Sequence, residues 1–293
     1  MTDSITVKNL YKAYGKKQVL CGVSFRVKQG ETFGLLGVNG AGKTTAIECI
    51  ENMRKPDSGE AMVNGTLGIQ LQSTSLPETM TSKEAMQIFC SWHKVPYRGE
   101  LLERFDMAGE YLNKTYASLS TGRKRRLHLA LALCHSPSVL ILDEPTAGLD
   151  VEGRSALHAE IRKLNAEGVS ILMATHDMAE AEALCHHIAI LRNGVIAREG
   201  TPMELTASAS VQSRVFIKTR GNSLYGFAPK GELTADGYLS FPCINTAEFL
   251  LPLLSHVRAS RDDVRDLRVE RASIEDIFLE VAGENHPTGG ETR

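Results

Sequence analysis

The order of apolar and polar positions predicts that strands and helices alternate through most of this chain. In residues 23–28, apolar Val23, Phe25 and Val27 alternate with polar neighbours, which is the pattern of a strand buried on one face. Further strands are predicted at residues 5–10, 32–36, 139–143 and 170–174, and helices at 43–53, 151–167 and 178–185. This alternation favours a layered α/β fold.

Local signals add detail to this outline. A helical insertion is predicted from about residue 73 to 118, with helices at 82–93 and 100–105. Asn193-Gly194 separates two apolar runs and predicts a tight hairpin, because both turn residues tolerate positive φ. Thr201-Pro202 then predicts a helix start, with threonine as the cap and proline at the first helical position.

The pattern changes near residue 208, where the small and polar segment 207–213 is typical of a linker. Beyond it, strands are predicted at 214–219, 238–241 and 266–269, and helices at 247–254 and 273–281. Ser273 and Asp276 have the spacing of a capping pair for the last helix. We therefore expect a first domain over residues 1–208, a small α+β domain over 209–284, and a disordered tail over 285–293.

Composition excludes several classes of protein. Hydrophobic residues make up 42% and charged residues 23% of the 293 positions, which is ordinary for a globular protein. The net charge of -2 gives no basic field for nucleic acid. The first ten residues lack a signal-peptide pattern, and the apolar runs are too short to span a bilayer. Six well-separated cysteines without a CxxC pair favour buried thiols in a reduced compartment.

Residues 37–44 read GVNGAGKT and fit the phosphate-binding pattern GxxxxGK[ST] without a mismatch. The glycines let the backbone curl, so that consecutive N–H groups point at phosphate oxygens. In this pattern Lys43 reaches the β- and γ-phosphates, and the Thr44 hydroxyl binds Mg²⁺. The motif follows a predicted strand and precedes a predicted helix, whose N-terminal end attracts anions. This context favours phosphate binding over a chance glycine-rich turn.

The predicted strand 139–143 ends in two carboxylates, Asp143 and Glu144, followed by Pro145. Strand alternation sends these two side chains in different directions. One can hold Mg²⁺, and the other can orient or deprotonate a water molecule aimed at the γ-phosphate. Alone, such a pair is usually only a strand end, but its combination with the phosphate loop favours ATP hydrolysis.

With these motifs together, the sequence strongly resembles the ATP-binding cassette (ABC) ATPases from about residue 5 to 205. The resemblance implies the P-loop NTPase cassette fold, a RecA-like mixed-sheet core with antiparallel β and helical subdomains. It makes Glu144 the general base and Asp143 the Mg²⁺ carboxylate. The segment 174–177 (ATHD) makes His176 a γ-phosphate sensor, and Gln72 matches the glutamine near Mg²⁺ and the attacking water, with Gln70 as the nearby competitor.

The resemblance also implies which residues bind ATP. Tyr14 stands where the family stacks an aromatic ring on adenine, although a surface tyrosine is the alternative. Residues 119–123 (LSTGR) resemble the signature LSGGQ, and 146–150 (TAGLD) match the segment that ends at Asp150. The expected nucleotide-binding residues are Tyr14, Gly37, Val38, Asn39, Gly40, Ala41, Gly42, Lys43, Thr44, Thr45, Ser120, Gly122 and Asp150; those for Mg²⁺ are Thr44, Gln72 and Asp143.

The signature departs from the family at Thr121 and Arg123, whereas Ser120 and Gly122 are retained. Ser120 is expected to cap the helix that follows, whose N-terminus is electropositive. The four basic residues 123–126 form either a solvated face or a group near the nucleotide, and the sequence favours neither. A second departure is the short segment between Gly59 and Gln72, where a surface loop of typical members is missing.

In this family the phosphate loop and the signature meet only across a dimer, so the resemblance implies two ATP molecules held between two cassettes, either copies or paralogues. It implies a separate transmembrane permease and a peripheral position on the cytoplasmic face of the membrane. Residues 267–283 look like the end of cassettes that serve drug, antibiotic and polysaccharide exporters, which favours export. The alternative is a soluble cassette ATPase that acts on ribosomes or nucleic acid. Against it, this chain has one cassette and no sustained heptads.

The run Cys185-His186-His187 is a candidate metal site, because it places three possible ligands side by side. It lacks a second ligand pair at a suitable spacing, so the end of a helix and the start of a strand are the better interpretation.

Overall fold

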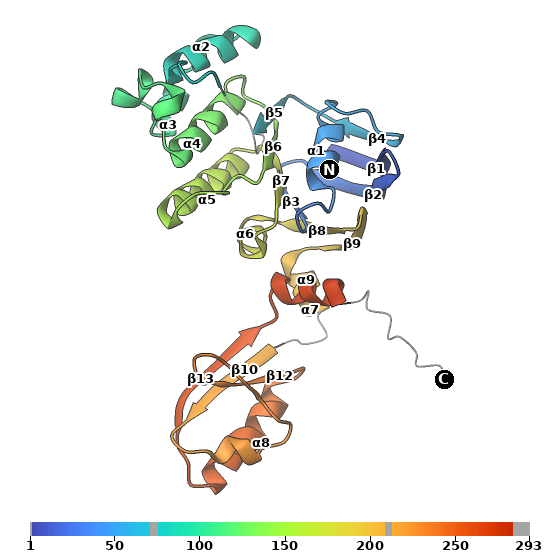
Figure 1. The fold of residues 1–293 in the computed structure, drawn as a ribbon, viewed down its shortest axis with the longest axis vertical. Coiled ribbons are helices and arrows are strands. Elements are labelled where there is room, and N and C mark those ends of the chain that lie inside the picture. Colours follow the sequence, from blue (N-terminus) through green and yellow to red (C-terminus); the bar gives the residue numbers. More distant parts are fainter. Residues whose placement is uncertain (1, 71–75, 209–212, 284–293) are drawn as a thin grey trace. The chain divides into compact units, whose positions relative to one another are not determined.

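The computed structural model describes residues 2–70, 76–208 and 213–283 (Figure 1). Gln72 and the predicted tail 285–293 lie outside these residues, as does most of the predicted linker. Contacts divide the chain into two units, Met1–Glu199 and Gly200–Arg293, nine residues before the boundary expected from the sequence. The reason is that α7 (Pro202–Ala207) packs against α9 (Ile274–Gly283) of the second unit and buries Leu205.

The central element of the first unit is a six-stranded sheet. Its strand order is β5-β6-β7-β3-β8-β9, with β5 (Leu67–Gln70), β6 (Val139–Asp143), β7 (Ser170–Thr175), β3 (Thr32–Leu36), β8 (His187–Arg192) and β9 (Val195–Gly200). The first five strands are parallel. Every residue of β3, β6 and β7 is buried, as expected for parallel strands covered on both faces. Their carboxyl ends meet at one edge of the sheet, which is where ligands bind in such folds.

A second, antiparallel sheet of the first unit has the order β2-β1-β4 and consists of β1 (Asp3–Tyr14), β2 (Lys17–Lys28) and β4 (Ser58–Val63). The predicted alternation in 23–28 is confirmed, because Val23, Phe25 and Val27 are buried and their neighbours Ser24 and Arg26 are exposed. β1 is longer than predicted, since its ladder with β2 continues through several register shifts to the hairpin.

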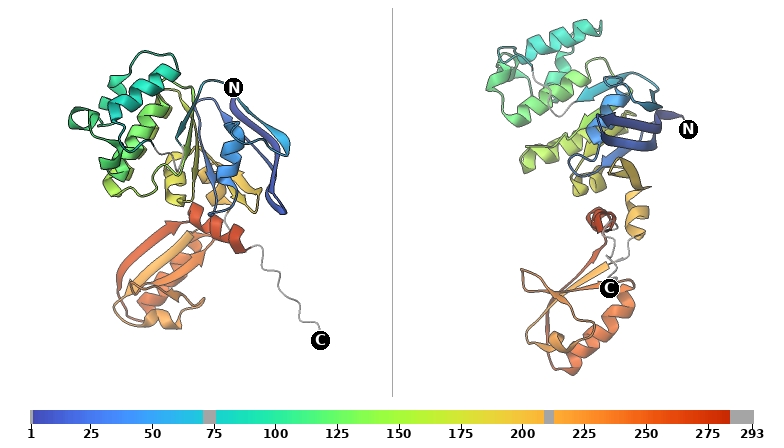
Figure 2. Two further views of the ribbon diagram at one scale, coloured as in Figure 1. Left: turned by 45° about the horizontal axis from the view of Figure 1, so that its top comes forward. Right: turned by 45° about the vertical axis from the view of Figure 1, so that its right-hand side comes forward.

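Helix α1 (Lys43–Ile50) packs between these two sheets, as Figure 2 shows. It ends three residues before the predicted end at 53, because Asn52 takes a left-handed conformation with φ 59°, which stops the helix. On the other face of the six-stranded sheet, α6 (Met178–Leu184) contacts β3 and β7, and α5 (Val151–Ala166) packs against α6.

Three helices form the helical part of the first unit, namely α2 (Ser82–Trp92), α3 (Gly99–Arg104) and α4 (Thr121–Ala132) (Figure 1). Two short 3₁₀ turns, Gly109–Leu112 and Tyr116–Ser118, lead into α4. Helix α2 begins with a capping box, in which Thr81 and Glu84 exchange hydrogen bonds. Helix α4 joins this part to the sheet through contacts with β5.

His128 is the buried polar residue of α4. Its Nε2 lies 2.9 Å from the Tyr116 hydroxyl, and the two rings meet edge to face. Burial, with help from the charges of Arg125 and Lys124, lowers the pKa of His128 from 6.5 to about 4. The folded protein therefore binds this proton less readily than the unfolded chain does.

We expect His128 to make the protein sensitive to acid. The contribution of neutral His128 to the free energy of unfolding is complete above pH 6.5. It is lost as the pH falls through about 4, which lowers the free energy of unfolding by about 3 kcal/mol in total. His128→Gln removes the titrating group, so its melting temperature should fall less between pH 7 and pH 4.5 than that of the parent. Tyr116→Phe removes the hydrogen bond but keeps the imidazole of His128. Its melting temperature should therefore fall with pH as steeply as that of the parent. An identical pH slope in His128→Gln would contradict this expectation.

The second unit is a small α+β structure, as the sequence predicts. Its antiparallel sheet has the order β11-β12-β10-β13, with β10 (Ser213–Thr219), β11 (Glu232–Leu233), β12 (Leu239–Cys243) and β13 (Val264–Arg271). A 3₁₀ turn covers Ser223–Gly226. The apolar face of α8 (Thr246–Ala259) packs on this sheet through Leu253 and Val257. The predicted capping pair is confirmed, since Ser273 and Asp276 exchange hydrogen bonds at the start of α9.

Helix α8 continues five residues beyond its predicted end at 254, with Pro252 inside it. Val257 is buried one turn after Leu253, so tertiary packing extends the helix past the proline. Among the residues that the structure describes, no helix has both the length and the apolar character needed to cross a membrane.

Candidate nucleotide-binding site

The loop between β3 and α1 is the centre of the site. Gly42 has φ 113°, and a Cβ there would lie 2.9 Å from the Leu20 side chain, so the backbone path requires glycine. At Gly37 an added Cβ would lie 2.6 Å from the Leu191 carbonyl oxygen. Helix α1 begins directly after the loop, so its unpaired N–H groups and positive dipole end face the same space. The local structure therefore suits a bound anion.

Lys43 is buried at the base of this loop, with only 5% of its surface exposed. Its Nζ donates a hydrogen bond to the Gly37 carbonyl at 2.7 Å and lies 3.5 Å from Glu144 Oε1. A buried ammonium requires such partners. Phosphate oxygens would provide stronger ones, because they are charged and can approach all three N–H donors.

Asp143 ends β6 beside the phosphate loop and is 1% exposed. Its Oδ2 accepts a hydrogen bond from the Thr44 hydroxyl at 3.2 Å, whereas its buried Oδ1 has no hydrogen-bond partner among the described residues. Burial raises the pKa of Asp143, although the Thr44 hydrogen bond opposes this change. A hydroxyl and an unpaired carboxylate oxygen are the hard donors that Mg²⁺ prefers, so the residues present fit this ion.

Glu144 follows with a left-handed φ of 49°, which is unusual for a residue with a side chain. Its N–H donates to the Ala174 carbonyl of β7 at 2.9 Å, which anchors this conformation. The carboxylate connects two groups, because Oε1 faces Lys43 and Oε2 accepts a hydrogen bond from His176 Nδ1 at 2.6 Å. His176 follows β7 and is half exposed, whereas Glu144 is buried. The strand ends thus bring the predicted base and sensor into direct contact.

A cavity opens over the phosphate loop. Its lining residues are Lys17, Val19, Asn39, Gly40, Gly42, Lys43, Thr44, Thr45 and Glu144. Most of them were predicted, but Lys17 and Val19 were not. Both belong to the start of β2, whose alternating pattern carries no sign of a ligand. Val38 is exposed beside this cavity, and Ala41 is buried in the loop.

Tyr14 ends β1 and is 41% exposed. The guanidinium of Arg54 lies 5.0 Å from the centre of its ring, so one ring face makes a cation–π contact. Tyr14 does not line the cavity over the phosphate loop, whereas Lys17, three residues later, does. A role for Tyr14 in adenine stacking therefore stays a prediction.

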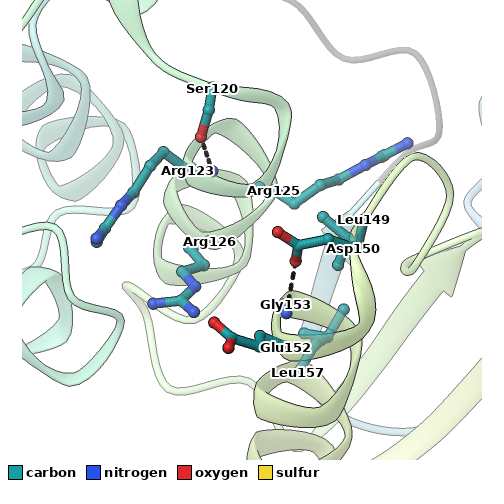
Figure 3. A pocket seen from close by; sticks show the side chains of 10 residues that line it. Ser120, Arg123, Arg125, Arg126, Leu149, Asp150, Glu152, Gly153 and Leu157 are labelled. Carbon is teal, nitrogen blue, oxygen red and sulfur yellow. Dashed lines mark hydrogen bonds between the residues drawn. The ribbon is translucent and has the colours of Figure 1, made fainter.

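The signature segment lines a different pocket, together with the segment that ends at Asp150 (Figure 3). Ser120 caps α4 by accepting a hydrogen bond from the Arg123 N–H at 3.3 Å, as predicted from the sequence. Asp150 caps α5 in the same way, with its Oδ1 2.8 Å from the Gly153 nitrogen. Two helix N-termini therefore open into this pocket, and Gly122 leaves its wall free of a side chain.

The basic residues after Gly122 have neighbours of their own. The Arg123 guanidinium lies 4.0 Å from the centre of the Tyr111 ring and donates a hydrogen bond to the Asp106 carbonyl oxygen. Figure 3 shows that Arg123 points away from Asp150. Arg126 forms an ion pair with the Asp106 carboxylate. Arg123 and Arg126 thus tie α4 to the loop after α3 and do not form a freely solvated face.

Arg123→Gln should therefore affect stability more than catalysis. The variant loses the contact with Tyr111, so we expect the melting temperature to fall, consistent with about 0.5–1 kcal/mol for a cation–π contact. The ATPase rate per folded molecule should stay unchanged or rise, because Gln is the family's residue here. Tyr111→Leu, which removes the same contact from the other side, is the matched control. A large loss of activity in Arg123→Gln alone would instead give Arg123 a catalytic duty.

Two residues near the acidic strand carry buried polar atoms that the sequence does not assign to the site. Glu51, directly after α1, has no hydrogen-bond partner in the described part of the chain; burial and the nearby Asp143 raise its pKa to about 7. Gln70 ends β5 beside Leu142, and its buried amide is also without a partner among those residues. Glu51 lies in no motif that the sequence presents. Gln72, the preferred glutamine, lies outside the described residues.

Comparisons with known proteins agree with this geometry. The family model described as ABC transporter matches residues 20–147. The daunorubicin resistance ATP-binding protein DrrA3 of Streptomyces coeruleorubidus is 32% identical, over 97% of this chain and 98% of that protein. The Nod factor export ATP-binding protein I of Burkholderia thailandensis is 36% identical, over 95% and 97% of the two chains.

Solved structures show the same similarity. An ATP-binding subunit of an ABC transporter is 29% identical and has a TM-score of 0.64, over 70% of this chain and 92% of that one. A bacterial ABC transporter cassette solved as a dimer is 25% identical, with a TM-score of 0.62 over 67% and 98%. The fold, the phosphate loop with its acidic strand, and these full-length relatives lead to one conclusion: this chain belongs to the ATP-binding subunits of the ABC transporter family.

Proposed function

We propose that this chain is the ATP-hydrolysing subunit of an exporter, and that two cassettes close around two ATP molecules to drive a separate membrane permease. The observation that carries the proposal is that side chains of the phosphate loop contact those at the end of the acidic strand. Thr44 contacts Asp143, and Lys43 contacts Glu144, so one cavity contains the groups for phosphate binding and for water activation.

In the proposed mechanism, ATP displaces the contacts that Lys43 makes in the free protein. The β- and γ-phosphate oxygens replace Gly37 and Glu144 as the partners of the Lys43 ammonium. Glu144 Oε1 is then free to accept a proton from water, while His176 holds Oε2. Thr44 and Asp143, with Gln72, would hold Mg²⁺, which supplies positive charge to the phosphate oxygens.

The need for two cassettes follows from the separation of the two pockets. The lining of the cavity over the phosphate loop and that of the signature pocket share no residue. A single chain therefore offers two incomplete halves. In the proposed dimer, Ser120 and Gly122 of one subunit approach the γ-phosphate bound to the other. ATP binds the closed dimer better than the open one, and hydrolysis reverses this preference.

Export is supported by the full-length relatives, which are named for resistance and for Nod factor export, and whose matches extend through the second unit. By analogy we assign this chain to a complex with a permease, on the cytoplasmic face of the membrane. An action on ribosomes or nucleic acid is the second candidate, but no observation on this chain favours it.

Purification of the tagged chain from membranes of its native cell tests this proposal. We expect a multi-span permease to co-purify in a fixed ratio, and Glu144→Gln with ATP to strengthen the association between cassettes. Lys43→Ala, which should not bind ATP, is the control for nucleotide dependence. Recovery with ribosomes or nucleic acid, and without a membrane protein, would contradict it.

A further inference from the structure

Two helices of the helical part end beside each other at a group of soft ligand atoms. His93 directly follows α2, and Cys134 and His135 follow α4. Each of these three residues offers one ligand atom, and these atoms lie within 4.8 Å of one another. The sequence does not indicate this group, because 40 residues separate His93 from Cys134, whereas Cys185, His186 and His187 are adjacent.

His135 is oriented as a metal ligand would be. Its Nε2 lies 3.1 Å from the Leu67 carbonyl oxygen, which can only accept a hydrogen bond. The proton of the neutral ring therefore sits on Nε2, and Nδ1 keeps a free lone pair. That Nδ1 lies 3.9 Å from the Cys134 sulfur. A backbone carbonyl that fixes the tautomer in this way is typical of metal-bound histidines.

His93 completes the group from the other helix. Its ring stacks on that of His135, with 3.9 Å between the ring centres and 4° between the planes. This stacking needs at least one neutral ring, and both burial and His93 lower the pKa of His135. His93 is exposed, so its side chain can turn to direct a nitrogen toward Cys134.

The electrostatic surroundings favour a cation on balance. The C-terminal ends of α2 and α4, where helix dipoles are negative, both lie at this group. Arg98 opposes this, because its guanidinium donates hydrogen bonds to the Cys134 carbonyl and the Ser136 hydroxyl. The same charge favours the thiolate of Cys134, whose thiol pKa burial otherwise raises to about 11. A metal ion would replace the thiol proton, which passes to solvent.

A second cysteine, Cys90, lies next to Cys134. The buried Cys90 accepts a hydrogen bond from the Cys134 thiol, and its own S–H donates to Met86 Sδ at 3.6 Å. Cys90 and His93 are three residues apart at the end of α2, and so share one face of the helix. The site thus contains a CxxH pair, Cys90 and His93, and an adjacent pair, Cys134 and His135. Among the described residues, no carboxylate belongs to this group.

We propose that His93, Cys134 and His135 bind Zn²⁺, with Cys90 close enough to Cys134 to serve as the fourth ligand. Nitrogen and sulfur donors without carboxylates select zinc over Mg²⁺ or Ca²⁺. Donors around tetrahedral zinc lie roughly 3.3–3.8 Å apart. The three ligand atoms lie within 4.8 Å of one another, so the group must close by about 1 Å at most, and the exposed His93 is free to move. The bound ion would fasten α2 to α4 and, through His135, to β5.

Titration of the reduced, full-length protein with Co²⁺ as a spectroscopic probe tests this site. We expect one equivalent to produce a thiolate-to-cobalt charge-transfer band that Zn²⁺ then removes. Co²⁺ bound by the oxygen ligands near Asp143 would not give this band. Cys134→Ser should weaken the band, the double variant Cys90→Ser/Cys134→Ser should lose it, and His93→Ala should weaken binding roughly tenfold or more.

His186→Ala is the matched control, because His186 follows the buried Cys185 in a second Cys-His pair and should leave the titration unchanged. Absence of the band in the parent, or an unchanged band in Cys134→Ser, would overturn the proposal. Should Cys134→Ser fail to fold, the exposed position 93 still decides the question: unchanged Co²⁺ affinity in His93→Ala rejects the site.

Discussion

Glu144→Gln is expected to stop ATP turnover while ATP still binds. The amide keeps the size of the side chain, but it cannot take a proton from water. Loss of a general base typically costs roughly 10²- to 10⁴-fold in rate. Lys43 loses its carboxylate partner in the variant, and the phosphates replace it once ATP is bound. Steady-state phosphate release and direct ATP binding measure the two effects separately.

The same variant should accumulate in the closed state. If hydrolysis opens the dimer, Glu144→Gln with ATP should sediment as a dimer, and the parent should do so only transiently. Glu78→Gln makes the same chemical change at an exposed position and should behave as the parent. A Glu144→Gln protein that hydrolyses ATP at the parent rate would remove Glu144 from the role of base.

Lys43→Ala should abolish tight ATP binding. The buried ammonium is the one charge aimed at the phosphates from within the loop, and hydrogen bonds to charged groups contribute about 1.5–3 kcal/mol each. Loss of two such contacts weakens binding roughly 100-fold or more. Isothermal titration of ATP into the variant measures the change.

Lys28→Ala removes an exposed lysine from β2 and should leave ATP affinity unchanged. Melting curves are needed beside the titration, because Lys43→Ala leaves Glu144 buried with His176 as its remaining partner. A folded Lys43→Ala protein with parent affinity would contradict the assignment of the phosphate loop.

Contiguous motifs made much of this molecule predictable from its sequence. The phosphate loop depends on glycines and a lysine within eight positions, and Asp143 and Glu144 directly end an apolar strand. Parallel strands then bring such ends together at one edge of a sheet, so the contact between Glu144 and His176 follows from topology. The hairpin at Asn193-Gly194 and the caps at Ser120 and Thr201 rest on similarly local rules.

Features that depend on tertiary packing were not predictable. Helix α8 passes through Pro252 because Val257 packs on a sheet formed by distant strands. Arg123 finds Tyr111 and Asp106 only once the helical part is folded, and no spacing in the sequence reveals that pair. Likewise His93 meets Cys134 because α2 packs against α4. Motifs indicate local backbone geometry, whereas these contacts depend on how separate helices and strands pack together.

A crystal structure of the chain with Mg²⁺ and a non-hydrolysable ATP analogue tests the account most directly. We predict the triphosphate within residues 37–44, Lys43 on its β- and γ-phosphates, and the metal ion beside Thr44 and Asp143. Ser120 of a second copy should face the γ-phosphate. A nucleotide bound elsewhere, or a phosphate loop whose hollow stays filled by Lys43 and Glu144, would contradict the account.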